Sequence, residues 1–153
     1  MANLKKMKVA ILAGGFGSRL DETTKLIPKP LVKIGNKPII WHLMKIYSYY
    51  GINDFIVCLG YKGNLLKQEL NRIKENWKIT YVDTGLKTMT GGRIKGVEKF
   101  LDNDFFLCTY GDGISNVNIN KLVKFHLKNK RLATVTTVRP RSRFGRLTIK
   151  KNT

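Results

Sequence analysis

The sequence feature that most constrains the fold is a glycine-rich turn placed directly after a short apolar segment. Residues 8–13 predict a buried strand, and Gly14, Gly15 and Gly17 follow it at once. Glycines let a backbone approach an anion closely, and their N–H groups form a concave nest that suits phosphate. The turn therefore predicts a phosphate-binding loop at the end of a buried strand.

Two cations follow this turn and strengthen the prediction. Arg19 supplies a planar guanidinium, and Lys29, held between two prolines, supplies a point charge. The spacing excludes the commoner phosphate loops: no Gly-x4-Gly-Lys-Ser/Thr run is present, and Gly-x-Gly-x-x-Gly fails at Leu20. A glycine-rich turn that binds nothing is the alternative for the glycines alone, and the two cations argue against it.

The chain alternates apolar, strand-like segments with amphipathic, helical ones throughout its length. Such alternation with short connections predicts one domain of the α/β class, with a three-layer, mostly parallel, Rossmann-like sheet and helices on both faces. Pro38 is expected in the first turn of its helix, with Asn36 as the cap. The expected strands are residues 8–13, 54–59, 78–83, 104–109 and 132–138, with another from 146, and the expected helices are residues 38–50, 62–74, 91–101 and 121–129.

Two further loops follow expected strands and carry polar groups, and ligands of such sheets bind at the carboxyl ends of the strands. Asp112 stands between two glycines, where a lone carboxylate suits Mg²⁺ bound together with phosphate oxygens; a simple turn is the alternative. Residues 84–93 present hydroxyls, backbone groups at a helix start and a cation, which suit a nucleotide base and its phosphates, although a capped helix start would look the same.

Composition narrows the partner classes. The formal charge is +19, which suits either a nucleic-acid surface or lysine-rich solvated faces, and the scattered lysines without interleaved aromatics favour the latter. No Asp or Glu follows Asp112, which suggests that something acidic covers the last quarter of the chain. Without a run of twenty apolar residues or a signal peptide, a cytoplasmic protein with no membrane partner is expected.

Residues 12–20, followed by Pro-Lys-Pro at 28–30, resemble the signature of the sugar-phosphate nucleotidyltransferases. The segments 38–47, 60–63, 82–93, 109–113 and 143–145 are similar to those of the glucose-1-phosphate cytidylyltransferases within that family. This resemblance implies transfer of CMP from CTP to glucose 1-phosphate, giving CDP-glucose and pyrophosphate, with Mg²⁺ as cofactor.

The resemblance also implies roles for individual residues. Arg19, Lys29 and Asp112 would be catalytic, with Asp112 as the metal ligand. Nucleotide binding would fall to Leu12, Ala13, Gly14, Gly15, Phe16, Gly17, Ser18, Arg19, Lys29, Thr88, Thr90, Gly91, Gly92, Arg93 and Gly111.

The chain departs from the family in length. Only residues 71–76 stand where relatives carry a longer insertion, and no second metal-binding aspartate follows Asp112. Residues 1–153 are therefore expected to be the nucleotide-binding part of a truncated nucleotidyltransferase domain. Alternatives are a nucleotide-binding fragment without turnover, completed by another chain or as a homo-oligomer, an enzyme using UTP or dTTP and another sugar phosphate, and a nucleic-acid-binding surface at residues 131–146.

Overall fold

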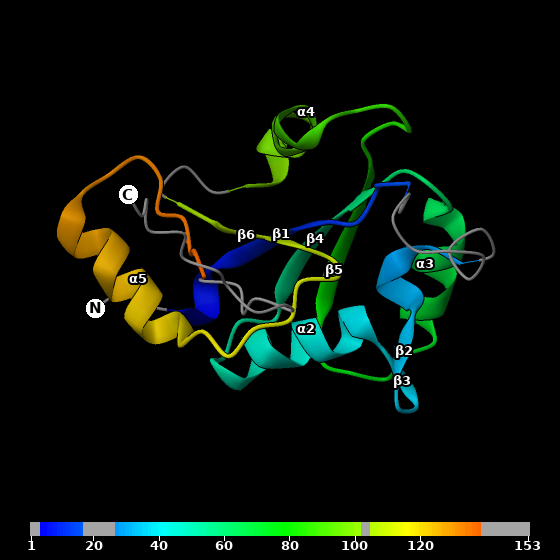
Figure 1. Ribbon diagram of the computed structural model, residues 1–153, viewed down its shortest axis with the longest axis horizontal. Helices are drawn as coiled ribbons and strands as arrows, with labels where there is room; N and C mark the ends of the chain where they lie inside the picture. The colour runs from blue at the N-terminus through cyan, green and yellow to red at the C-terminus, as the bar shows by residue number, and fades with distance from the viewer. Residues whose placement is uncertain (1–3, 17–26, 102–104, 139–153) are drawn as a thin grey trace, which may run out of the picture.

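The computed structural model describes residues 4–16, 27–101 and 105–138. Its centre is a parallel sheet in the order β5-β4-β1-β6, made of β1 (Lys8–Leu12), β4 (Asp54–Leu59), β5 (Lys78–Asp83) and β6 (Leu107–Tyr110) (Figure 1). Val9 of β1 lies opposite Phe55 of β4 and Leu107 of β6. The two central strands, β1 and β4, are nearly continuous apolar runs because both of their faces are covered.

Helices cover both faces of the sheet, which confirms the three-layer α/β class (Figure 1). On one face, α2 (Ile39–Tyr49), α3 (Gly63–Asn71) and α5 (Ile119–Asn129) contribute side chains to one buried cluster that also contains Phe55 and Val57 of β4. On the other face, α4 (Thr90–Gly96) and the following 3-10 turn η3 (Glu98–Phe100) pack on Ile56 and Cys58. The alternation of these β4 side chains follows from the two-residue period of a strand.

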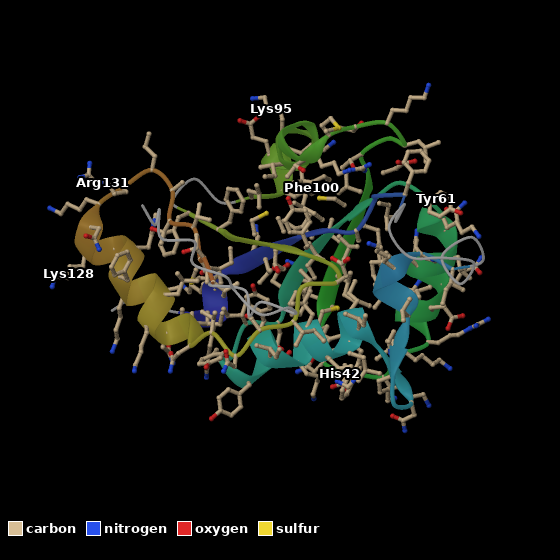
Figure 2. The ribbon with its side chains drawn as sticks, in the orientation of Figure 1. His42, Tyr61, Lys95, Phe100, Lys128 and Arg131 are labelled. Carbon is tan, nitrogen blue, oxygen red and sulfur yellow. The ribbon has the colours of Figure 1, made fainter. Side chains whose placement is uncertain are left out.

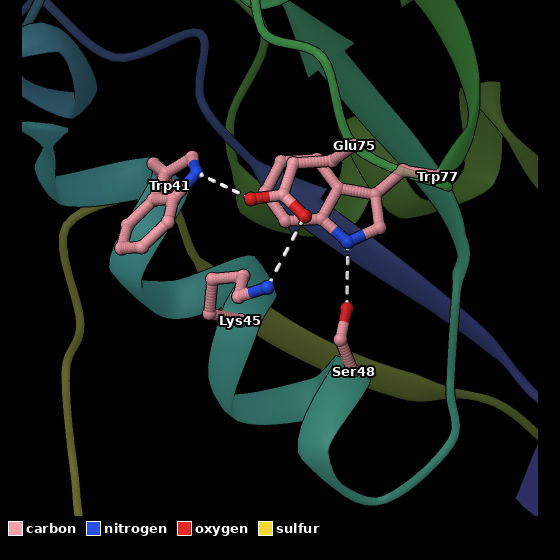
Figure 3. Close-up of polar contacts among 5 residues, drawn as sticks. All are labelled: Trp41, Lys45, Ser48, Glu75 and Trp77. Carbon is pink, nitrogen blue, oxygen red and sulfur yellow. Dashed lines mark hydrogen bonds and ion pairs between the residues drawn. The ribbon is translucent and has the colours of Figure 1, made fainter.

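The connection between α3 and β5 is anchored to α2 by side-chain hydrogen bonds (Figure 3). The carboxylate of Glu75 accepts from Trp41 Nε1 and from Lys45 Nζ, both at 3.1 Å. Trp77 Nε1 donates to Ser48 Oγ at 2.6 Å, and its ring packs edge-on against a buried phenylalanine of β4. This short connection is therefore an ordered part of the helical layer.

Two sequence predictions were wrong. Residues 132–138 form no strand, and the side chains of Leu132, Val135 and Val138 are exposed, because no described strand lies beyond β6 to pair with them. Asn36 does not cap α2, which begins after Pro38 without a side-chain cap. Instead, β2 (Lys33–Ile34) and β3 (Lys37–Pro38) form an antiparallel hairpin that places Asn36 in its turn.

Several element bounds differ from the prediction. The helix expected at 91–101 ends at Gly96 and continues only as η3, and α5 begins two residues early, at Ile119. Asn118 Oδ1 caps α5 by accepting from the Lys121 N–H at 3.0 Å. The strand expected from residue 146 lies outside the described residues. Within the described part of the chain, no helix is long and apolar enough to cross a membrane.

Candidate nucleotide-binding site

The loops that follow β1, β5 and β6 meet at the carboxyl edge of the sheet around a cavity of about 340 Å³. Ten of the residues predicted from the sequence line this cavity, although they come from four separate segments of the chain. They are Leu12, Ala13, Gly14, Gly15, Phe16, Lys29, Thr88, Thr90, Arg93 and Asp112.

The other predicted residues divide into two groups. Gly17, Ser18 and Arg19 lie outside the described residues. Gly91, Gly92 and Gly111 are described but do not line the cavity, so the structure does not place them against a ligand in it.

Lys29 and Asp112 are brought to the cavity by two turns that touch each other. The Pro-Lys-Pro segment forms the 3-10 turn η2 (Lys29–Leu31), in which Pro30 is buried. A Cβ added at Gly111 would lie 3.0 Å from Pro30 Cγ, so glycine at this position lets the two turns pack closely. The Gly111 N–H also donates to the Leu12 carbonyl at 3.0 Å, which fixes the Asp112 turn against β1.

Arg93 is the buried centre of the opposite wall. Its residue is only 5% exposed, and Nη1 and Nη2 each make two hydrogen bonds to protein oxygens. Nη1 donates to the Leu59 carbonyl at 3.0 Å and to Thr84 Oγ1 at 2.7 Å. Nη2 donates to the carbonyls of Gly14 at 3.0 Å and Leu86 at 3.3 Å. One guanidinium therefore ties the glycine turn, the end of β4 and the 84–93 loop together.

The guanidinium of Arg93 also explains two glycines. A Cβ at Gly14 would overlap Arg93 Nη1, and a Cβ at Gly60 would lie 2.8 Å from the same nitrogen and 2.6 Å from the Gly14 carbonyl oxygen. At Gly15, by contrast, an added Cβ would meet no atom of the described residues within 4 Å. Protein packing therefore requires glycine at positions 14 and 60, whereas the space beside Gly15 is open for a ligand.

The charges around the cavity suit an anion with a bound cation. Lys29, Lys87 and Arg93 line it, and Asp112, whose residue is exposed, is the one carboxylate among its described lining residues. The described residues contain no cluster of three or more His, Cys, Asp or Glu side chains that could hold a metal alone. A lone carboxylate fits Mg²⁺, which binds proteins through one or two carboxylates together with substrate phosphates. Mg²⁺ binding by Asp112 stays a prediction.

Sequence reasoning missed five residues that line the cavity. Two of them could have been found, because Lys87 lies in the predicted 84–93 loop and Tyr110 ends the strand before the Gly-Asp-Gly turn. Leu86 and Met89 lie in the same loop and Pro30 belongs to the Pro-Lys-Pro segment, but their apolar side chains offer a ligand no polar group, so they were not predicted as site residues. The five are Pro30, Leu86, Lys87, Met89 and Tyr110.

Comparison with known proteins identifies the family of the chain. Residues 8–153 match the family described as Nucleotidyl transferase. The chain belongs to the nucleotidyl transferase family. As a family member, it shares 44% identity over 167 residues with the glucose-1-phosphate cytidylyltransferase of Salmonella typhimurium, covering 94% of this chain and 65% of that protein. Over 164 residues it shares 43% identity, with the same coverage, with a Bacillus subtilis protein named probable glucose-1-phosphate cytidylyltransferase.

The chain is also similar in structure to a solved protein. The crystal structure of HddC from Yersinia pseudotuberculosis matches with a TM-score of 0.71 and 31% identity, covering 79% of this chain and 54% of that one. The nucleotidyl transferase chain described here therefore has the family's α/β fold, and it spans 65% of the length of the curated relatives named above.

Proposed function

We propose that this chain carries the nucleotide-binding part of a glucose-1-phosphate cytidylyltransferase, which transfers CMP from CTP to glucose 1-phosphate and releases pyrophosphate. The observation that carries the proposal is the convergence of the glycine turn, Lys29, Asp112 and the 84–93 loop on one cavity. The names of the two relatives with 43% and 44% identity support the choice of CTP and glucose 1-phosphate.

The proposed reaction needs positioning and charge neutralisation more than covalent help. A phosphate oxygen of glucose 1-phosphate attacks the α-phosphorus of CTP, and the bond from that phosphorus to the pyrophosphate oxygen breaks. The open backbone at Gly15 would admit the nucleotide phosphates, and the Lys29 ammonium would neutralise charge shared between the α-phosphate and the sugar phosphate. Mg²⁺, held by Asp112 and phosphate oxygens, would supply further charge neutralisation.

A second candidate is Mg²⁺-dependent nucleotide binding without turnover. It is favoured by Asp112 being the one carboxylate among the described cavity-lining residues. One carboxylate can hold Mg²⁺ with a bound nucleotide, whereas turnover also needs interactions that are stronger in the transition state than in the ground state.

The test is pyrophosphate release by this chain with Mg²⁺, glucose 1-phosphate and CTP, run beside UTP and dTTP. Release with CTP alone is expected, and Lys29→Met should lower it by about 10²–10³-fold if Lys29 acts on developing charge. Lys33→Met is the matched control, because Lys33 is an exposed lysine of β2 outside the cavity.

Other outcomes separate the candidates. Release with UTP or dTTP would keep the family and overturn the choice of CTP. Thermal stabilisation by Mg²⁺-CTP without release of pyrophosphate would favour the second candidate. If no nucleotide leads to pyrophosphate release and none stabilises the chain, the proposed function is overturned.

A further inference from the structure

Lys87 is a cation of the cavity to which neither the family resemblance nor the proposed reaction gives a role. It lies between Leu86 and Thr88 in the loop after β5, and all three of these residues line the cavity. Lys87 is exposed, and its ammonium makes no ion pair or hydrogen bond within the described part of the chain. Its donors are therefore available to a ligand in the cavity.

The other two cations that line the cavity, Arg93 and Lys29, are less available than Lys87 to bind a ligand. Arg93 uses its Nη1 and Nη2 atoms for four hydrogen bonds to the protein, which leaves only Nε without an acceptor among the described residues. Lys29 is half-buried in its 3-10 turn. Lys87 is thus the exposed cation of the described lining, and lysine binds phosphate as a compact, mobile point charge.

The backbone beside Lys87 is held in place, although its side chain is exposed. The Leu86 carbonyl accepts from Arg93 Nη2 at 3.3 Å, and the Gly85 N–H donates to Asp83 Oδ1 at 2.9 Å. Gly85 has a φ of 90°, which only glycine adopts without strain, so the loop turns sharply just before Lys87. A fixed backbone reduces the ordering that ligand binding requires to the rotamers of one side chain.

We propose that Lys87 binds a phosphate group of a substrate in this cavity, either a phosphate of the nucleotide or the phosphate of the acceptor sugar. The proposal rests on the proposed function, since it requires a phosphorylated ligand here. A nucleoside triphosphate carries more negative charge than one lysine and one bound Mg²⁺ can neutralise, so a second available ammonium, on the wall opposite Lys29, would add both affinity and orientation.

The experiment measures dissociation constants for Mg²⁺-CTP, CMP and glucose 1-phosphate by calorimetry at low ionic strength. The variants are Lys87→Met, Lys87→Arg and the control Lys95→Met. Lys95 lies on α4 outside the cavity and pairs with Glu98, and Figure 2 shows its side chain at the outer surface of the molecule. All four proteins are expected to have the same melting temperature, because these side chains are exposed.

Lys87→Met is expected to weaken the binding of a phosphorylated ligand by about two- to fivefold, the range for an exposed charge contact, and higher salt should reduce the difference. Lys87→Arg should restore most of the affinity, and Lys95→Met should leave it unchanged. If Lys87→Met loses affinity for CTP but not for CMP, Lys87 contacts the β- or γ-phosphate. Lower affinity for both nucleotides would assign Lys87 to the α-phosphate. Lower affinity for glucose 1-phosphate alone would assign Lys87 to the phosphate of the acceptor sugar.

Two results would overturn the inference, and they can be told apart. If the wild-type chain binds CTP and Lys87→Met binds all three ligands as tightly, Lys87 is a solvated lysine at the rim and only this inference fails. If the wild-type chain binds none of the three ligands, the proposed function fails and the role of Lys87 fails with it.

Discussion

The two walls of the candidate site are built in different ways. The wall formed by β4 and α4 is closely packed: five of the six β4 residues are buried, and the Arg93 guanidinium fills the space beside Gly14 and Gly60. The wall formed by β6 is open, because none of the four β6 residues is buried and Asp112 is exposed. Among the described strands, β6 is an edge and β4 is internal.

This difference suggests a division of labour between the walls. The packed wall fixes where the backbone of the glycine turn and the 84–93 loop can lie, whereas the open wall presents a carboxylate to the cavity. A site whose supporting contacts are rigid holds its ligand groups more precisely. Substitutions in the packed wall should therefore act mainly on stability, and those at open positions mainly on ligand binding.

The largest expected effect is on the packed wall. Arg93→Met should lower the free energy of unfolding by about 2–4 kcal/mol, because several hydrogen bonds to a charged group are lost while the cost of burying that charge is relieved. Arg72→Met is the matched control: Arg72 is an exposed arginine of the α3 end whose ion pair with Glu69 is solvated, so the change should stay within about 0.5 kcal/mol. Urea denaturation measures both, and equal values for the two variants would contradict the packed-wall interpretation.

A smaller effect on stability is expected from alanine substitutions at two glycines, Gly60 and Gly15. Gly60→Ala should cost about 1–3 kcal/mol of stability, because its Cβ would press on the Gly14 backbone, which cannot give way as a side-chain end can. Gly15→Ala places a Cβ where no described residue lies within 4 Å, so the free energy of unfolding should change by no more than about 0.5 kcal/mol.

Gly15→Ala, the less destabilising of the two variants, should have the larger effect on ligand binding. If phosphate approaches the backbone at Gly15, Gly15→Ala should weaken the binding of Mg²⁺-CTP although the protein remains stable. Calorimetric titration measures this, and full affinity in Gly15→Ala would remove the glycine turn from the phosphate site.

The smallest expected effect is a difference in thiol reactivity between Cys58 on β4 and Cys108 on β6. Burial raises the pKa of Cys58 on β4 to about 11, and burial of the Cys108 thiol also raises its pKa, although Cys108 is exposed as a residue of the edge strand β6. A maleimide at pH 8 should therefore modify Cys108 in the folded protein and Cys58 only on unfolding. Cys108→Ser should abolish the fast reaction, and rapid labelling of that variant would show that β4 is not protected.

The raised thiol pKa values also predict a pH dependence. Between the ordinary cysteine pKa of 9.0 and about 11, the folded state holds the Cys58 proton while the unfolded state releases it. Stability from this group is therefore complete below pH 9 and declines as the pH rises through that window. Thermal unfolding of Cys58→Ala beside the wild type, from pH 8 to 11, measures this contribution.

The described part of the fold was predictable wherever a local pattern was strong. The apolar runs of β1 and β4 and the amphipathic pattern of α2 indicated their elements correctly. The apolar residues of a central strand or a core-facing helix are those that the fold buries, so their spacing is visible in the sequence. Residues 132–138 are rich in β-branched side chains, which are typical of strands, yet they form no strand. A strand also needs a partner, and the pattern of one segment does not say whether a neighbour is present.

The site shows the same limit at the level of single residues. The sequence determined which groups could serve a phosphate ligand: a glycine turn after a buried strand, a lysine between prolines, and a carboxylate between glycines. Only the tertiary structure decided that Arg93 turns inward to the carbonyl of Gly14, a residue 79 positions away. Local periodicity reflects contacts within one strand or helix, whereas the position of a buried cation depends on acceptors that distant segments bring together in the folded chain.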